Sequence, residues 1–483
     1  MITFSMDNPT PPKINQNISR CPPSVDFQDR LDTSARSVQP CAKLLTALPA
    51  VILAIGFIFL IYLQASISTG VFYNGDCGLK ALQTMQIASG NFRTSLELSG
   101  TQWEKELWAQ GMYPFDAPFA YRVGDKYFVQ YPYFFPLLSA PFYFVLGYHG
   151  FYLIPVLSAF LLWVCLLYAA NRMRCHPLET SLLLLILIFA SPVTLYSAIL
   201  GEQTLALLLA FGGIVILLFP PSRITRGRSA SLAGFLVGIA SWFRPEMYCL
   251  GIAVIISMFL WKILQRTAVN PSRFLTSFSL SFLILILHNL IVFQSPFGVR
   301  SNEIMSGLAI AERLQVYRIV MSSLWNAVAY FFPLIFVPVL LAVGIWINRE
   351  RKLSGESLFC SLVIVLYVLT VPAIVPNFGG KQWPPRYFLI LAPLTALLIG
   401  NMFLSLARKW RRIHSYLLAA AILGLTTWCI RVNTIEGYEY LSHEYAQRAA
   451  PPVDFLMRSP LHNVAVSNQY LSQEFAFATQ SKV

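Results

Sequence analysis

The strongest constraint on the fold is a series of uninterrupted apolar runs of about 20 residues each. About 20 residues of α-helix span the hydrocarbon core of a bilayer, and a helix satisfies its backbone hydrogen bonds internally. Only 12% of the 483 residues are charged, whereas soluble domains carry about 25%. The sequence therefore predicts an all-α polytopic membrane protein.

We expect about 11 transmembrane helices (range 10–13), with a long first extracytoplasmic loop that contains juxtamembrane helices. The expected spans are 44–66, 151–171, 179–199, 203–220, 230–243, 246–263, 273–293, 324–347, 357–376, 386–405 and 413–431. One further run, 131–147, is short and contains Pro132, Pro136 and Pro141. Because proline removes a backbone donor and kinks a helix, we interpret this run as a re-entrant or interfacial segment.

Basic residues on the short connections decide the orientation. If 131–147 does not cross, the clusters on the cytoplasmic side are Arg172/Arg174, Arg223/Arg226/Arg228, Lys262/Arg266/Arg273, Arg349/Arg351/Lys352 and Arg408/Lys409/Arg411/Arg412. If it crosses, all of them move outside. The positive-inside rule favours the first arrangement, with a cytoplasmic N-terminus and an extracytoplasmic C-terminus. The net charge of +13 has the same origin and gives no reason to expect nucleic acid.

The domain organisation follows from this orientation. We expect a disordered cytoplasmic tail over 1–42, a transmembrane domain over 43–431 with its first outer loop at 67–150, and an extracytoplasmic C-terminal extension over 432–483. The first apolar run lies too far from the start for a cleavable signal peptide, so it is read as an uncleaved anchor. Charged and apolar residues alternate at helical spacing over 303–322, which suits a helix on the membrane surface.

Asp76 is the first residue that could carry chemistry. It lies in NGDCGLK just beyond the first span, and Gly75 and Gly78 permit a tight turn around it. It can act as a general base, or it can simply cap the helix expected over 77–89, since Asp is a preferred N-cap. Lys80 and Gln83 follow within two turns and either face the same pocket or are solvated.

Two short outer hairpins hold further charges. Glu202 lies in LYSAILGEQTLA, where a carboxylate is either functional or merely hydrated. Arg244 and Glu246 flank Pro245 in the second hairpin and either neutralise one another or serve a site. An Arg at the mouth of a helix bundle suits phosphate recognition, because its planar fork binds oxyanions through two hydrogen bonds.

The outer loop NFGGKQWPPRY (377–387) brackets Trp383 with Lys381 and Arg386. The two cations could hold a phosphate while the ring stacks on a sugar. Alternatively the loop is an interfacial anchor, because Trp, Tyr and Arg are common at membrane boundaries. His288, late in its span, lies near the same outer level or serves as an interhelical hydrogen-bonding group.

The order of these motifs resembles the GT-C superfamily of integral-membrane glycosyltransferases. Over roughly 45–400, an acidic residue after the first span is followed in turn by YPYFFPLLSAPFY, LYSAILGEQTLA, AGFLVGIASWFRPE, FQSPFG and GGKQWPPRY. The resemblance is to the glycosyltransferase family 39-like bacterial branch, which is related to protein O-mannosyltransferases and to lipid A aminoarabinose transferases.

The resemblance implies transfer of a sugar from a polyprenyl-phosphate donor to an acceptor glycan, lipid or protein on the outer face of a bacterial inner membrane. By the resemblance, Asp76 is the catalytic base, with inversion at the anomeric carbon. The donor phosphate ligands would be Lys80, Arg244, Lys381 and Arg386. Many relatives carry Asp-Glu where this chain has Asp76-Cys77, so a second acid is unassigned, with Glu202 as a possible substitute.

The six histidines are scattered without metal-ligand spacing, so the sequence gives no reason to expect a zinc site. It requires no cofactor, and a divalent metal is left open. Two other functions stay in view. A lipid-linked sugar flippase would be expected to place its charges near the membrane midplane. A polysaccharide polymerase or ligase that uses lipid-pyrophosphate donors would share the outer site. The charges at the outer helix ends favour a transferase.

Overall fold

The computed structural model describes residues 26–98, 100–265, 269–299, 310–338, 354–375, 382–407, 412–460 and 468–480. The chain divides into two units, Met1–Ala47 and Leu48–Val483. Helix α1 (Asp26–Ala65) begins in the first unit, inside the range of the predicted tail 1–42. The tail, the domain boundaries and the sidedness of the membrane stay predictions.

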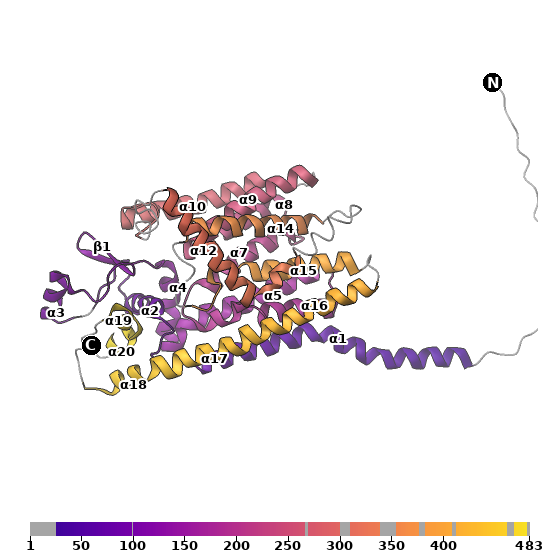
Figure 1. Ribbon diagram of the computed structural model, residues 1–483, viewed down its shortest axis with the longest axis horizontal. Helices are drawn as coiled ribbons and strands as arrows, with labels where there is room; N and C mark the ends of the chain where they lie inside the picture. Colours follow the sequence, from indigo (N-terminus) through magenta and orange to yellow (C-terminus); the bar gives the residue numbers. More distant parts are fainter. Residues whose placement is uncertain are drawn as a thin grey trace, which may run out of the picture. The chain divides into compact units, whose positions relative to one another are not determined.

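The second unit consists almost entirely of helices (Figure 1). Between α1 and α5 lie α2 (Gly75–Ala88), α3 (Gln102–Leu107), the π-helix η1 (Trp108–Met112), β1 (Ala120–Val123), β2 (Lys126–Val129), α4 (Phe134–Leu146) and the 3₁₀-helix η2 (Gly147–Tyr152). Next come α5 (Leu153–Arg172), α6 (Pro177–Ile188), η3 (Pro192–Ala198), α7 (Gln203–Leu218), α8 (Arg226–Phe243), α9 (Glu246–Gln265) and α10 (Pro271–Phe293).

The remaining elements close the bundle and form the C-terminal part. They are α12 (Ile310–Phe331), η4 (Pro333–Ile335), α14 (Gly355–Thr370), η5 (Val371–Ala373), η6 (Arg386–Phe388), α15 (Leu391–Ala407), α16 (Arg412–Ile430), the π-helix η7 (Arg431–Glu436), α17 (Gly437–Ser442), the π-helix η8 (His443–Ala449), α18 (Ala450–Arg458), α19 (Gln469–Glu474) and α20 (Ala476–Gln480).

Six helices in the described residues are long and apolar enough to cross a membrane, or seven if the bent pair α6–η3 is one span. Two shorter apolar helices, over 203–218 and 391–401, accompany them. These helices confirm that the protein is an integral membrane protein, while the expected number of about 11 spans stays a prediction.

The run 131–147 adds no span of its own to this count, because α4 is grouped with α5. The chain turns between them at η2. Gly147 has a φ of +61°, and a Cβ on Gly150 would lie 2.1 Å from the carbonyl oxygen of Phe142. Only glycine permits an approach this close.

Two predicted details differ from the structure. Helix α12 runs without a break through residues 322–324, so it joins part of the expected surface helix 303–322 to part of the expected span 324–347. The expected all-α outer loop also contains a small hairpin, in which β1 and β2 pair antiparallel from Ala120↔Val129 to Val123↔Lys126. The tight turn at Gly124, with a φ of +66°, closes the hairpin.

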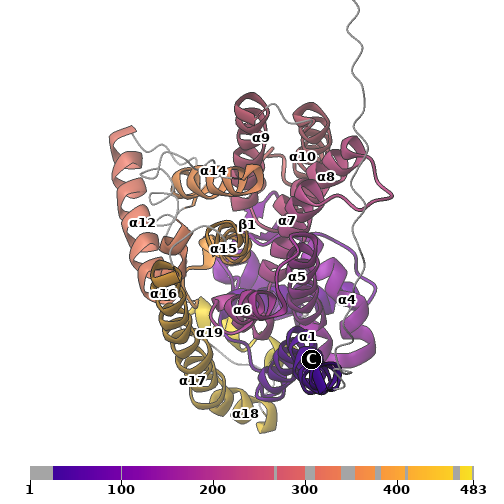
Figure 2. The same cartoon turned by 90° about the vertical axis from the view of Figure 1, so that its right-hand side faces the viewer.

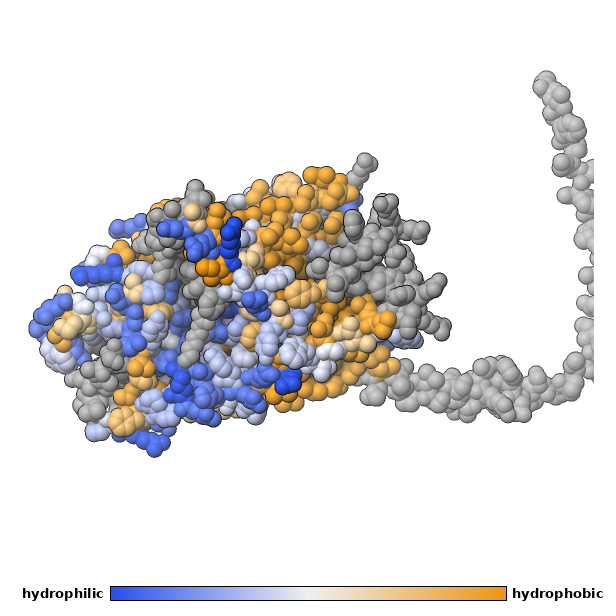
Figure 3. All heavy atoms as spheres, in the orientation of Figure 1, coloured by the Kyte–Doolittle hydropathy of each residue, from blue (hydrophilic) through white to orange (hydrophobic). Residues whose placement is uncertain are grey.

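The core of the bundle surrounds α15. Its residues from Leu391 to Ile399 are buried, and the view in Figure 2 places α15 among α5, α6, α14 and α16. The outward residues are apolar: Ile58 is 66% exposed and Ile291 is 82% exposed. Figure 3 shows such hydrophobic side chains over α9 and α16, as expected for surfaces that face lipid.

Candidate functional site

Asp76 occupies the first turn of α2, which begins two residues earlier than the predicted 77–89 helix. The N-cap of this helix is Asn74, whose side chain accepts a hydrogen bond from the backbone N–H of Cys77. The interpretation of Asp76 as the capping residue is therefore wrong. Because the cap is supplied by Asn74, the Asp76 carboxylate is available for other contacts.

The Asp76 carboxylate is held by three side chains from distant parts of the chain. The Tyr131 hydroxyl donates to Oδ1 at 2.5 Å. The Gln382 amide donates to Oδ2 at 3.4 Å, and the Arg386 guanidinium lies 3.7 Å from the same oxygen. The Asp76 side chain is 20% exposed and that of Arg386 is 10% exposed, so both remain within reach of a ligand.

A chain of buried ion pairs lies next to Asp76. Lys80 Nζ is 2.7 Å from Glu202, and each of these side chains is only 2% exposed. Glu202 also lies 3.2 Å from Arg244, and Arg244 contacts Glu246 at 2.7 Å. The Lys80 ammonium lies 4.8 Å from the centre of the Tyr131 ring, which links these pairs to the contacts of Asp76.

Six predicted residues from four separate segments thus meet in one place. We call this group the charged cluster; its members are Asp76, Lys80, Glu202, Arg244, Glu246 and Arg386. They come from the outer loop 67–150, both predicted hairpins and the first residue of η6. The prediction that these segments belong to one end of the bundle agrees with this arrangement.

Burial and the neighbouring charges shift the pKa values of Glu202 and Arg244 in opposite directions. Burial alone would raise the pKa of Glu202, but Lys80 and Arg244 together lower it to about 2. Burial would lower the pKa of Arg244, and Glu246 and Glu202 raise it instead. Glu202 is therefore an ionised, closely paired carboxylate and not the merely hydrated residue that a hairpin position suggested.

Tyr131 stays protonated beside Asp76. Its burial and the neighbouring Asp76 carboxylate raise the pKa of Tyr131 well above its ordinary value. A neutral phenol is a hydrogen-bond donor, so Tyr131 orients the Asp76 carboxylate. The opposite carboxylate oxygen faces Gln382 and Arg386.

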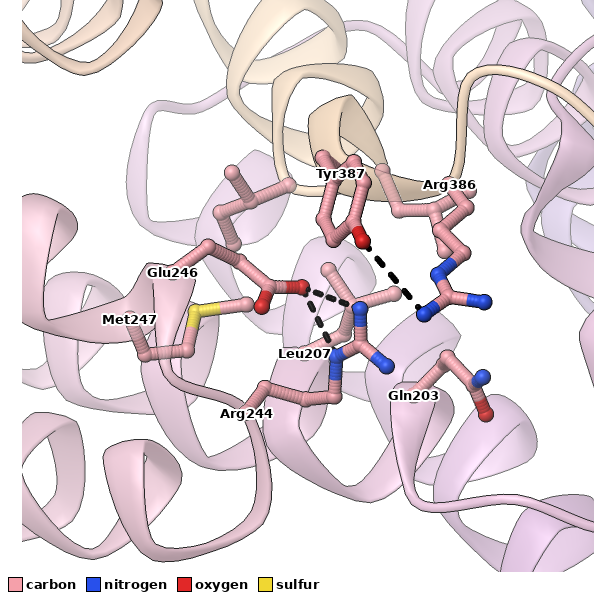
Figure 4. A pocket seen from close by; sticks show the side chains of 9 residues that line it. Gln203, Leu207, Arg244, Glu246, Met247, Arg386 and Tyr387 are labelled. Atoms are coloured by element: carbon pink, nitrogen blue, oxygen red, sulfur yellow. Dashed lines mark hydrogen bonds and ion pairs between the residues drawn. The ribbon is translucent and has the colours of Figure 1, made fainter. Parts of the chain in front are cut away.

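A small pocket opens beside the cluster (Figure 4). Its polar lining comes from Gln203, Arg244, Glu246, Arg386 and Tyr387. Arg244 lies 5.6 Å and Arg386 5.0 Å from the centre of the Tyr387 ring, so that one aromatic ring stands against both guanidinium groups. Two arginines at one pocket can bind an oxyanion.

The other predicted site residues lie outside the charged cluster. Trp383 is buried and donates through its indole N–H to Asn433 at 3.1 Å. Gln83 donates to the Thr94 carbonyl at 3.0 Å. His288 lies against the rings of Phe134 and Phe293, contacts that do not join it to the cluster. Lys381 lies outside the described residues.

Position 77 explains part of the departure from the Asp-Glu pair of many relatives. Cys77 is only 1% exposed and belongs to the hydrophobic core. Burial raises the pKa of its thiol to about 12, so the thiol is unreactive at neutral pH. A carboxylate at this position would be removed from water, which is costly for a charged group.

Sequence reasoning missed four side chains of the site: Tyr131, Gln203, Gln382 and Tyr387. Each lies within a motif that was singled out, but nothing in the sequence distinguished these tyrosines and glutamines from interfacial ones. Among the described residues, no three His, Cys, Asp or Glu side chains form a group that could hold a metal ion.

No family model matches the chain, and no curated protein matches it significantly. Solved structures do. ArnT from Cupriavidus metallidurans bound to undecaprenyl phosphate superposes with a TM-score of 0.51 at 14% identity, over 89% of this chain and 84% of its own. The apo state of the same protein gives a TM-score of 0.50 at 12% identity, over 88% of this chain and 84% of its own.

A third solved structure, the Archaeoglobus fulgidus oligosaccharyltransferase in complex with Zn and sulfate, gives a TM-score of 0.49 at 12% identity, over 87% of this chain and 58% of its own. A TM-score below 0.5 does not establish a shared fold. The two ArnT structures show that the chain has the GT-C fold, which confirms the fold that the order of its motifs implied.

Proposed function

We propose that the protein is a membrane glycosyltransferase that moves a sugar from a polyprenyl-phosphate donor to an acceptor hydroxyl or amine, with Asp76 as the base. The observation that carries this proposal is the Asp76 carboxylate, which is 20% exposed and held by a short hydrogen bond from Tyr131. The Glu202 and Glu246 side chains are 2% and 3% exposed and are engaged in close ion pairs.

The donor phosphate is proposed to bind at the pocket between Arg244 and Arg386. Arg386 lines this pocket, 3.7 Å from Asp76 and 3.4 Å from the Tyr387 hydroxyl, so its guanidinium is placed to contact a phosphate there. Lys381 would add a further cation. Lys80 would act more indirectly, because it is 2% exposed and paired with Glu202. The ArnT structure with bound undecaprenyl phosphate supports a lipid phosphate as ligand.

The proposed step is a direct displacement. The acceptor oxygen or nitrogen forms a bond to the anomeric carbon as the bond from that carbon to the phosphate oxygen breaks. Asp76 takes the acceptor's proton, and the polyprenyl phosphate leaves with the electron pair. Arg244 and Arg386 stabilise the charge that develops on the leaving phosphate. A single displacement inverts the anomeric configuration.

The test is turnover by the purified protein in nanodiscs. Radiolabelled undecaprenyl-phosphate sugars are offered with glycan, lipid and peptide acceptors. Asp76→Asn is expected to lower kcat by roughly 10²–10⁴, the range of a general base. Asp125→Asn serves as the matched control, because Asp125 is an exposed residue of the same loop in the β1–β2 turn.

Three results would contradict the proposal. Unchanged turnover in Asp76→Asn would remove the base. Donor translocation across the bilayer without any sugar transfer would identify a flippase. Transfer from lipid-pyrophosphate donors alone would identify a polymerase or ligase. The anomeric configuration of the product, read by NMR, tests inversion separately.

A further inference from the structure

The C-terminal segment formed by α19 and α20 packs directly against α2 beside Asp76, and Figure 1 shows these three helices together. The contact is closest at two glycines. A Cβ on Gly78 would lie 1.7 Å from the carbonyl oxygen of Gln473, and a Cβ on Gly75 would lie 2.2 Å from its Oε1. Both distances are below the 3.0 Å that real Cβ contacts respect, so only glycine fits at either position.

Further contacts anchor this segment at its first residue and in its middle. Glu474 accepts two hydrogen bonds from the Arg448 guanidinium, at 2.9 and 3.0 Å. The side-chain oxygen of Gln469 accepts from the backbone N–H of Asp116 at 3.1 Å. A bidentate pair of this kind fixes orientation as well as distance. The segment is therefore tied to η8 on one side and to the outer loop on the other.

The segment occupies a different face of α2 from the charged cluster. Asp76 and Lys80 are four residues apart and share one face, whereas Gly75 and Gly78 share the face that meets Gln473. Ala476 of α20 packs in one small hydrophobic cluster with Leu79 and Tyr131. It thus supports the same tyrosine whose hydroxyl donates to Asp76.

From these contacts we infer that residues 469–480 act as a clamp, which holds the first turn of α2 and Tyr131 in place and so positions the Asp76 carboxylate. Gln473 is the positioning residue of this clamp, and it acts through its backbone carbonyl, which makes the closest contact with α2. The inference rests on the proposed role of Asp76. Misplacement of a reacting group by 1 Å can cost about 10²-fold in rate, so the clamp should matter for kcat more than for binding of the donor.

Gly78→Ala tests the clamp by forcing Gln473 away from α2. We expect kcat to fall by at least about 30-fold, with the KM for the donor within about twofold of wild type. Alanine favours helix more than glycine does, so the loss cannot come from a weakened α2. Gly424→Ala is the matched control, because this glycine lies inside α16 and a Cβ there meets nothing within 4 Å.

A pair of double variants separates the clamp from general damage. In Gly75→Ala the new methyl group meets the Gln473 side chain, whereas in Gly78→Ala it meets the Gln473 backbone. Adding Gln473→Gly should therefore restore most of the rate lost in Gly75→Ala and little of that lost in Gly78→Ala. Equal rescue of both, or of neither, would overturn the inference.

Hydrogen exchange in the first turn of α2 gives a readout that does not depend on activity. Faster exchange in Gly78→Ala than in wild type and Gly424→Ala supports the clamp, and unchanged exchange overturns it. If the wild type transfers no sugar from any lipid donor, the proposed function is wrong. The hydrogen-exchange rates would still show whether residues 469–480 hold the first turn of α2. A rise in donor KM as large as the fall in kcat would indicate a structural role only.

Discussion

At the scale of single residues, the three carboxylates of the charged cluster differ in what they contact. Glu202 and Glu246 each lie within about 3 Å of a cation and are almost fully buried. Asp76 has a phenol as its closest partner and keeps a longer contact to Arg386. A carboxylate that is held by a neutral donor is oriented without being neutralised, which suits a group that must accept a proton.

The Tyr131 hydroxyl is expected to contribute to the rate through this orientation. Tyr131→Phe removes the shortest hydrogen bond to Asp76. Hydrogen bonds to charged groups contribute about 1.5–3 kcal/mol, so kcat should fall by about tenfold or more. Steady-state kinetics with the lipid donor measures this. Tyr127→Phe is the control, since Tyr127 stacks on Tyr113 away from the cluster; a similar loss in both variants would argue against the assignment.

Glu202 is expected to make stability depend on pH. Its pKa of about 2 lies below its ordinary value of 4.5, so its contribution is present above pH 4.5 and is lost as the pH falls towards 2. Glu202→Gln leaves Lys80 and Arg244 without their shared carboxylate and should destabilise the protein by about 3–5 kcal/mol at neutral pH. The variant should also flatten the loss of stability on acidification.

Thermal unfolding in detergent between pH 7 and pH 3 checks the prediction for Glu202. Glu106→Gln is the matched control, because Glu106 is an exposed carboxylate of α3, and it should unfold like the wild type at every pH. A Glu202→Gln protein as stable as the wild type at pH 7 would mean that the ion pairs do not contribute net stability.

At the scale of elements, Asn433 in the π-helix η7 joins parts of the bundle that are remote in sequence. Its amide nitrogen donates to the carbonyls of Ala190 and Phe331, at 2.9 and 2.6 Å. Its oxygen accepts from the Trp383 indole at 3.1 Å. The irregular turn thus fixes Trp383, whose neighbour Gln382 donates to Asp76.

Asn433→Leu should therefore destabilise the protein and also disturb the site. The variant leaves the Trp383 N–H and two carbonyls buried without this partner, and each unsatisfied group costs about 1–3 kcal/mol. A lower midpoint of thermal unfolding is expected, together with a lower kcat. Asn171→Leu, at an exposed position near the end of α5, is the control. Loss of stability without any effect on kcat would show that Trp383 does not support the site.

Most elements could be predicted because hydrophobic length and charge determine them. Helices occur at the expected spans, from α1 through α16, wherever the structure describes these ranges. The predicted boundary between the surface helix 303–322 and the span 324–347 was wrong, because a charged stretch and an apolar stretch can share one continuous helix. The β1–β2 hairpin was missed since its strands are only four residues each, too short for a clear alternation.

At the scale of the whole molecule, the sequence identified the charged members of the site better than the neutral ones. Lys80, Glu202 and Arg244 stood out because charges near apolar runs are rare. Tyr131 and Gln382 did not, because their roles depend on which remote segments meet in space. The pairing of Lys80 with Glu202 likewise needs the fold, since 122 positions separate them in the chain.

The orientation of the molecule predicts which loops are accessible from outside. A cysteine introduced as Asp125→Cys, in the exposed β1–β2 turn, should react with a membrane-impermeant maleimide in intact cells. Ser222→Cys, in the exposed connection between α7 and α8, should react only after permeabilisation. The reverse pattern would invert the proposed topology. Cys77 cannot report on topology, because it is buried.

The helix that begins in α16 continues through η7, α17 and η8 to the end of α18. Its 43 residues from Tyr416 to Arg458 form one of the helices that are long and apolar enough to cross a membrane. At 1.5 Å per residue this is about 65 Å. When the helix lies close to the membrane normal, this length exceeds the roughly 40–45 Å of a whole bilayer with its headgroups. One end would then extend beyond the headgroups. In the predicted orientation that end stands on the outer side, the side from which an acceptor with a large water-soluble part would approach the proposed base Asp76.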